Sequence, residues 1–193
     1  MELTLKGKTA VIAGLRGSGK SNFAAVLAES YGALCLIYDT LGEYSGSAAY
    51  DRYVPADRGS IAELERVIRA CMRSRKYKLL VIDEAHRFAP PKPAPLPLAV
   101  RDLNDFCRHA QYDISVAFIT QRPVKLHQDI TEQADYLILF RLAGKNDQSY
   151  LNELSAGLGD AVQTLPDYHF YLCDQARNYK IMAPVAKAKK SDR

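Results

Sequence analysis

The stretch Gly14-Leu15-Arg16-Gly17-Ser18-Gly19-Lys20-Ser21 decides the fold of this chain. The apolar run from Thr9 to Ala13 comes before it and predicts a buried strand, and the run from Asn22 to Glu29 comes after it and predicts a helix. A glycine-rich loop between a strand and a helix is the context in which this spacing forms a phosphate-binding loop. The glycines let successive N–H groups point inward, and the helix directs the positive end of its dipole at the same place.

The end of this motif assigns roles to two side chains. Lys20 reaches the β- and γ-phosphates of a nucleotide, and the Ser21 hydroxyl suits Mg²⁺. A turn that binds nothing would leave the Gly-Lys-Ser ending unexplained. We therefore expect ATP and Mg²⁺ as cofactors, with nucleotide contacts from Gly14, Gly17, Ser18, Gly19, Lys20, Ser21 and Asn22.

Length and composition set broad limits. The 193 residues are the size of one compact domain, and a hydrophobic content of 48% is enough for a core. We expect one domain over residues 1–186 and a basic, disordered tail over 187–193. The net charge of +4 permits a nucleic-acid partner without requiring one. Without a secretory leader or a membrane-length apolar run, we expect a cytoplasmic protein with reduced, buried thiols at Cys35, Cys71, Cys107 and Cys173.

A second chemical signal follows the buried run Leu79 to Ile82. Asp83 and Glu84 come directly after this predicted strand, at the edge where open α/β sheets bind ligands. Asp83 suits a magnesium ligand, directly or through water, and Glu84 suits a general base that activates water. His86 completes Asp-Glu-Ala-His; it either couples the nucleotide state to a partner or caps a turn.

A third polar position, Gln121, follows the predicted strand Ser115 to Thr120. At the tip of a neighbouring strand, its amide can sense the γ-phosphate or orient water.

The alternation of strands and helices predicts an α/β fold with a mainly parallel central sheet. Further expectations are a short strand within 2–8, an irregular loop over 40–59, helices over 61–73 (capped by Ser60) and 98–110, an extended proline segment over 89–97, and a C-terminal hairpin of strands 168–173 and 179–182.

The chain resembles the HerA/FtsK superfamily of DNA-pumping P-loop ATPases. The resemblance covers Val11 to about Tyr150 and rests on four motifs: Gly14 to Ser21, Asp39-Thr40-Leu41-Gly42-Glu43-Tyr44, Asp83-Glu84-Ala85-His86 and Thr120-Gln121-Arg122-Pro123. Its single-domain size is most similar to the genome-packaging ATPases of internal-membrane viruses and to related plasmid-borne proteins.

The resemblance implies a RecA-like core that assembles into a ring, usually a hexamer, with duplex DNA through the middle. It implies that Lys20 and Ser21 hold phosphate and Mg²⁺, that Asp83 is the second metal residue, and that Glu84 and Gln121 are the catalytic base and the sensor. It also implies an arginine finger in trans, which is Arg108 here, with Arg122 and Arg141 as alternatives. The implied partners are the DNA backbone and a capsid, portal or membrane component, in the host cytoplasm or a virion.

Three other functions use some of the same residues. A small-molecule or nucleoside kinase has a phosphate loop and a similar length, but it does not need an Asp-Glu pair to activate water. A superfamily 2 helicase fragment is suggested by Asp-Glu-Ala-His alone, although such helicases need two RecA-like lobes. An ATP-dependent switch or scaffold would bind ATP and turn it over slowly, which the intact Glu84 disfavours.

Overall fold

A computed structural model describes residues 5–44 and 49–188 of the chain. Its centre is an eight-stranded sheet in the order β3-β2-β4-β5-β1-β6-β7-β8. The strands are β1 (Thr9–Ala13), β2 (Cys35–Tyr38), β3 (Asp51–Tyr53), β4 (Leu79–Ile82), β5 (Ser115–Thr120), β6 (Tyr136–Phe140), β7 (Phe170–Cys173) and β8 (Tyr179–Met182). The helices are α1 (Lys20–Tyr31), α2 (Ile61–Ser74), α3 (Leu98–Phe106), α4 (Gln128–Gln133), α5 (Lys145–Leu154) and α6 (Leu158–Gln163).

The sheet is parallel from β3 to β6 and turns antiparallel only at the C-terminal hairpin of β7 and β8. The predicted fold class, an α/β core with a mainly parallel sheet and a C-terminal hairpin, is therefore confirmed. The central strands are buried on both faces, which explains why they are continuous apolar runs rather than alternating ones.

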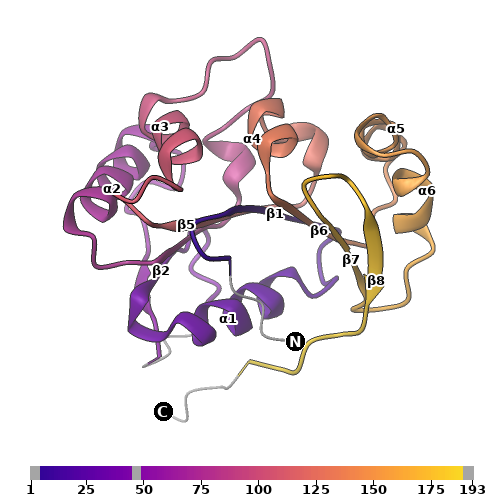
Figure 1. Ribbon diagram of the computed structural model, residues 1–193, viewed down its shortest axis with the longest axis horizontal. Helices are drawn as coiled ribbons and strands as arrows, with labels where there is room; N and C mark the ends of the chain where they lie inside the picture. Colours follow the sequence, from indigo (N-terminus) through magenta and orange to yellow (C-terminus); the bar gives the residue numbers. More distant parts are fainter. Residues whose placement is uncertain (1–4, 45–48, 189–193) are drawn as a thin grey trace.

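Helices cover the two faces of the sheet unequally (Figure 1). Helices α2 to α6 lie on one face, where strand residues such as Val11 and Leu80 pack against them. Helix α1 covers the other face, where Ile12 packs with Phe23 and Leu27. The chain after β8 runs along this second face beside α1, so the C-terminal segment lies on the side of the phosphate-binding helix (Figure 1).

Several element boundaries differ from the expectations. The loop over 40–59 contains a short strand, β3, which pairs with β2 although only three residues long. Its half-exposed Asp-Arg-Tyr sequence has no apolar periodicity that would reveal it. Helix α3 ends at Phe106, before the turn at Arg108 and His109. Of the strand expected over 2–8, residues 5–8 are not strand and residues 2–4 lie outside the described part.

The helix cap and the buried thiols agree with the expectations. Ser60 caps α2, and its side chain accepts a hydrogen bond from the Glu63 N–H at 3.1 Å. The four cysteines are free and buried. No helix in the described ranges is long and apolar enough to cross a membrane. The tail over 187–193 falls outside the described residues except for Lys187 and Ala188.

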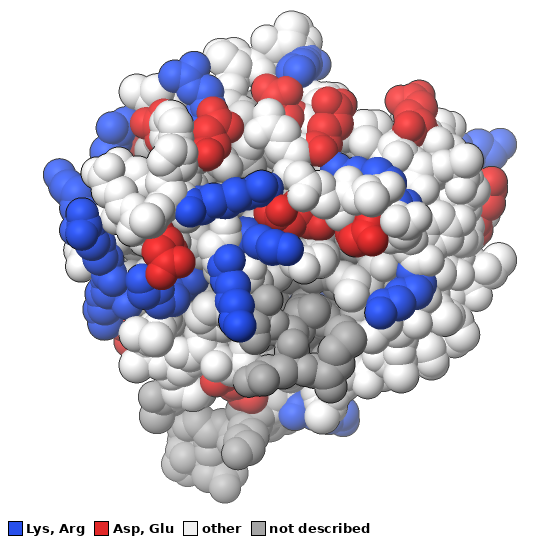
Figure 2. Space-filling model, in the orientation of Figure 1, with Lys and Arg blue, Asp and Glu red and all other residues white. Residues whose placement is uncertain are grey.

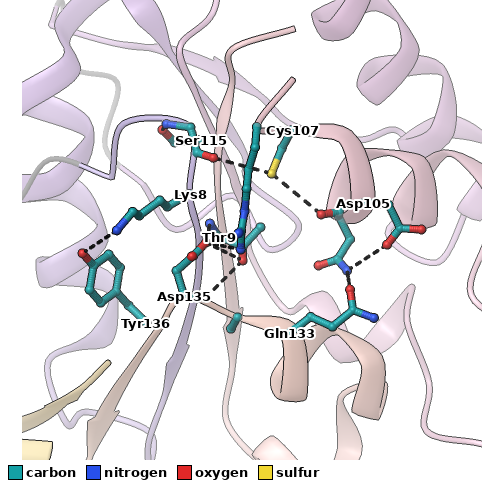
Figure 3. A network of polar contacts seen from close by, with 12 residues as sticks. Lys8, Thr9, Asp105, Cys107, Ser115, Gln133, Asp135 and Tyr136 are labelled. Carbon is teal, nitrogen blue, oxygen red and sulfur yellow. Dashed lines mark hydrogen bonds and ion pairs between the residues drawn. The ribbon is translucent and has the colours of Figure 1, made fainter. Parts of the chain in front are cut away.

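A polar cluster ties the strands together where they begin. The buried Asp135 carboxylate accepts hydrogen bonds from the backbone N–H of Thr9 at 2.9 Å and from its hydroxyl at 3.3 Å. Figure 3 shows these contacts beside the pair of Lys8 and Tyr136. This cluster fixes the beginning of β1 against the beginning of β6. The candidate site lies at the other end of the strands, where their carboxyl ends meet.

Candidate nucleotide-binding site

The predicted phosphate-binding loop leaves the carboxyl end of β1 and enters α1. Gly14 cannot be replaced without disturbance, because a Cβ there would lie 2.5 Å from the Cβ of Phe140. Gly19 has φ near +110°, a conformation that L side chains rarely adopt, and it forms the N-cap of α1. The strand, loop and helix thus have the geometry that the sequence predicts.

Lys20 is the first residue of α1 and points back over the loop. Its Nζ donates a hydrogen bond to the carbonyl oxygen of Leu15 at 2.8 Å, and only 7% of the residue is exposed. Burial lowers the pKa of Lys20, while the carboxylates of Glu84 and Asp83 act in the opposite direction. The ammonium group is therefore held inside the loop and faces the two acids.

Asp83 lies at the carboxyl end of β4 in a crowded, buried position. Its backbone carbonyl accepts a hydrogen bond from the Thr40 hydroxyl at 2.7 Å, and its Oδ1 accepts one from the Glu84 N–H at 2.9 Å. Burial, followed by the neighbouring Glu84 charge, raises the pKa of Asp83 from 3.8 to about 7. A site that disfavours the carboxylate in this way is prepared for a cation.

Glu84 has a left-handed backbone, with φ 50° and ψ 40°, which is uncommon for a residue with a side chain. Its carboxylate accepts a hydrogen bond from the Gln121 amide at 2.8 Å. His86, in the 3₁₀ turn η2 (Ala85–Arg87), places Nδ1 3.5 Å from Glu84 Oε2 and 3.3 Å from the Thr120 hydroxyl. Because burial lowers the pKa of His86, the neutral imidazole is favoured beside the acid.

Lys20, Asp83, Glu84 and Gln121 line one cavity of about 180 Å³. It is lined by Arg16, Gly17, Lys20, Ser21, Leu41, Glu43, Asp83, Glu84 and Gln121. Ser21 and Asp83 both line the cavity and carry a hydroxyl and a carboxylate, which are oxygen ligands that fit a hard cation such as Mg²⁺. The structure therefore brings together the predicted loop, the acidic pair and the glutamine.

The three candidate arginines lie in different places. Arg108 lies where the strands begin, at the opposite edge from Glu84, and pairs with the buried Asp135 at 2.8 Å. Arg122 follows Gln121 and pairs with the buried Asp147 of α5 at 2.9 Å. Arg141 pairs with Asp167 at 2.9 Å beside the phosphate loop. Because Arg108 pairs with Asp135 at the opposite end of the strands, it does not lie in the site of its own chain.

One residue was named in the sequence only as part of a motif, without a role of its own. Asp39, fully buried after β2, accepts hydrogen bonds from the N–H groups of Gly42, Glu43 and Tyr44 at 2.8 to 3.1 Å. It thereby shapes the loop that carries Leu41 and Glu43 into the cavity wall. The available signal was the acid at the end of an apolar strand, the same signal that identified Asp83.

The buried Asp83 predicts a pH-dependent stability. The raised pKa of this carboxyl does not lower the free energy of unfolding below pH 4, because the group is protonated in both the folded and the unfolded state. It lowers that free energy most above pH 7, where the buried group must ionise in the folded state. We expect the stability gain of Asp83→Asn over the parent chain, both without Mg²⁺, to grow between these limits and to reach on the order of 4 kcal/mol at pH 8, because one pKa unit corresponds to about 1.4 kcal/mol. Urea unfolding at pH 4, 6 and 8 measures the difference, and a gain that is the same at all three values contradicts the shift.

Comparison with known proteins supports the fold. No protein-family model and no curated protein matches the chain. Among solved structures, the genome packaging NTPase of Sulfolobus turreted icosahedral virus 2 in complex with ATPγS has a TM-score of 0.77. It is 23% identical, and the match covers 93% of this chain and 98% of that one. The chain has the fold of this packaging NTPase.

Two further structures share the fold at lower similarity. The pCW3 conjugation coupling protein TcpA has a TM-score of 0.61 and 16% identity, with 91% of this chain and 59% of that chain covered. The N-terminal domain of zonular occludens toxin from Neisseria meningitidis has a TM-score of 0.59 and 14% identity, with 95% and 97% covered. The resemblance to packaging ATPases drawn from the motifs is thus confirmed at the level of the fold.

Proposed function

We propose that the chain is an ATP-hydrolysing motor that moves duplex DNA, as a ring of identical subunits. The observation behind the hydrolytic part is the contact between Glu84 and Gln121 in the cavity that also holds Lys20 and Asp83. A kinase delivers the phosphoryl group to a substrate hydroxyl and does not need this arrangement, whereas a hydrolase needs a base that activates water.

Each residue has a defined task in this proposal. The loop N–H groups and Lys20 bind the phosphates, and Ser21 and Asp83 hold Mg²⁺, Asp83 directly or through a water molecule. Held there, Mg²⁺ would supply positive charge against the charge that develops on the phosphate oxygens. Glu84 accepts a proton from the attacking water, and Gln121 orients Glu84 and that water through its amide.

The DNA part of the proposal draws on the structural neighbours, whose names describe genome packaging and conjugation coupling. Contacts to the DNA backbone would provide binding without sequence preference. Figure 2 shows Lys and Arg side chains gathered on the side of the molecule where α2 lies. A basic cluster, residues 73–78, lies at the end of α2 and after it. Within it, Lys76 and Lys78 pair with Asp51 and Asp113, which supports a structural role for these two lysines.

We also propose that Arg108 completes the site of a neighbouring subunit. It lies at the opposite edge of the sheet from its own chain's phosphate loop and is half exposed, so a head-to-tail ring can bring it to the next subunit's nucleotide. A hexamer and a capsid, portal or membrane partner, in the host cytoplasm or a virion, belong to the same proposal.

Steady-state ATP hydrolysis with and without long duplex DNA tests this function. At low salt we expect DNA to stimulate hydrolysis, and we expect the rate per subunit to rise with protein concentration because sites are completed by neighbours. Hydrolysis that ignores both DNA and concentration contradicts the proposal, and a phosphorylated small-molecule product identifies a kinase.

Mixing two inactive variants tests the role of Arg108 within the same assay. Arg108→Ala keeps an intact loop, and Lys20→Ala keeps an intact Arg108, so a mixed ring contains complete sites. We expect the mixture to recover part of the activity that each variant lacks. No recovery, with both variants folded and assembled, excludes Arg108 as the finger and leaves Arg122 and Arg141.

A further inference from the structure

A second cavity opens beside the phosphate loop, on the outer side of Gly19. Its volume is about 660 Å³, and it is mainly apolar. It is lined by Gly19, Asn22, Phe140, Tyr168, Pro184, Val185, Lys187 and Ala188. This volume and this apolar lining are typical of a site that binds a small organic molecule. The phosphate cavity, at about 180 Å³, is smaller than such sites usually are.

One wall of this cavity is the segment after β8, which we call the C-terminal strap (residues 184–188). Asn22, in the first turn of α1, holds the strap with both ends of its side-chain amide. Its Nδ2 donates to the carbonyl oxygen of Ala186 at 3.0 Å, and its Oδ1 accepts from the N–H of Ala188 at 3.0 Å. Val185 and Ala188 pack against the α1 face of the core, so the strap is seated by both polar and apolar contacts.

Tyr168 also lines this cavity, and its backbone has an uncommon conformation. Tyr168 has φ near +63°, and 58% of the residue is exposed. A Cβ on Gly19 would lie 3.4 Å from its ring, which places the ring directly against the phosphate loop. The neighbouring Asp167 pairs with Arg141 at 2.9 Å, and the Arg141 carbonyl accepts a hydrogen bond from the Leu15 N–H. A bulky residue held at positive φ and left exposed is a feature of binding sites.

We propose that this cavity binds the nucleoside of the same nucleotide whose phosphates lie in the loop, with the base against Tyr168 and the strap closing over it. The proposal rests on the proposed nucleotide-binding function. Gly19 and Asn22 line this cavity, and the residues between them, Lys20 and Ser21, line the phosphate cavity, so the two cavities are adjacent. Asn22 then acts as a positioning residue: it holds the strap and does not itself contact the phosphates.

A comparison of two ligands distinguishes a role of Asn22 in holding the strap from a role in binding the phosphates. ATP and inorganic tripolyphosphate, each with Mg²⁺, are titrated into the full chain and followed by calorimetry. We expect Asn22→Ala to weaken ATP binding about tenfold or more, since an unfastened strap must be ordered again on binding, and to leave tripolyphosphate binding unchanged. Asn146→Ala, an exposed asparagine in the first turn of α5, is the matched control and should change neither.

Two results overturn the proposal. One is ATP binding by Asn22→Ala that equals the parent chain's, and the other is an equal loss for ATP and tripolyphosphate, which would place Asn22 at the phosphates. A parent chain that binds neither ligand overturns the proposed function as well, and so the two failures are distinguishable.

A second variant keeps the test independent of strap folding. Tyr168→Ala removes an exposed ring at little cost to the core, and we expect the same selective loss of ATP binding. Trypsin adds a structural readout, because cleavage after Lys187 in the strap should be slowed by ATP, not by tripolyphosphate, and not in Asn22→Ala. Unchanged ATP affinity in Tyr168→Ala, or equal protection by both ligands, contradicts the nucleoside assignment.

Discussion

Lys20→Ala is expected to lose ATP affinity by at least about a hundredfold, because it removes the buried cation that we propose binds the β- and γ-phosphates. The structure supports a large effect, because a hydrogen bond to the Leu15 carbonyl already orients the ammonium group over the loop. The side chain therefore loses little conformational entropy when ATP binds. Calorimetric titration of Mg·ATP measures the loss directly.

Lys145→Ala is the matched control for this change. Lys145 is also the first residue of a helix and also follows a glycine, but its side chain is exposed and lies outside the phosphate cavity. We expect it to bind ATP as the parent chain does. ATP affinity that survives Lys20→Ala would contradict the assignment of the phosphate-binding loop.

Glu84→Gln is expected to bind ATP normally and to hydrolyse it about 10² to 10⁴ times more slowly, because an amide cannot accept the proton of the attacking water. The replacement retains an oxygen that can accept the hydrogen bond from Gln121, so the local structure should persist. It also removes a charge next to Asp83, and the variant should therefore be no less stable than the parent chain. Single-turnover hydrolysis alongside equilibrium ATP binding separates the two effects.

Glu43 is the other carboxylate that lines the cavity away from the metal position, and Glu43→Gln therefore tests which acid is the base. We expect the larger loss of turnover for Glu84→Gln, because Glu84 contacts both Gln121 and His86. A larger loss for Glu43→Gln would assign the base to Glu43.

Much of the fold was predictable because its central strands are buried on both faces. The runs at 79–82 and 115–120 are almost wholly apolar, and each ends in polar residues at the same sheet edge. Strand β3 was missed because its three residues gain their pairing from β2 rather than from any pattern of their own. Helix α3 was expected to be longer because the polar turn after Phe106 does not break the periodicity.

The site was predictable where its functional residues are adjacent in the sequence, as in the phosphate loop and in Asp83 and Glu84. It was not predictable where a side chain contacts a distant segment. Asn22 reads as part of the loop motif, yet its amide holds residues more than 160 positions away. His86 had two open interpretations, and only the tertiary contact with Glu84 shows that it faces the proposed base. The division of the chain at residue 186 and the trans role of Arg108 stay predictions.

The central claim, ATP-driven movement along duplex DNA, is tested most directly by displacement of a third strand. A long duplex carries a labelled triplex-forming oligonucleotide at one end, and its release is followed after ATP is added. We predict release that needs ATP, that disappears with Glu84→Gln, and that slows as the duplex before the triplex lengthens. DNA-stimulated hydrolysis without any release of the third strand would contradict translocation.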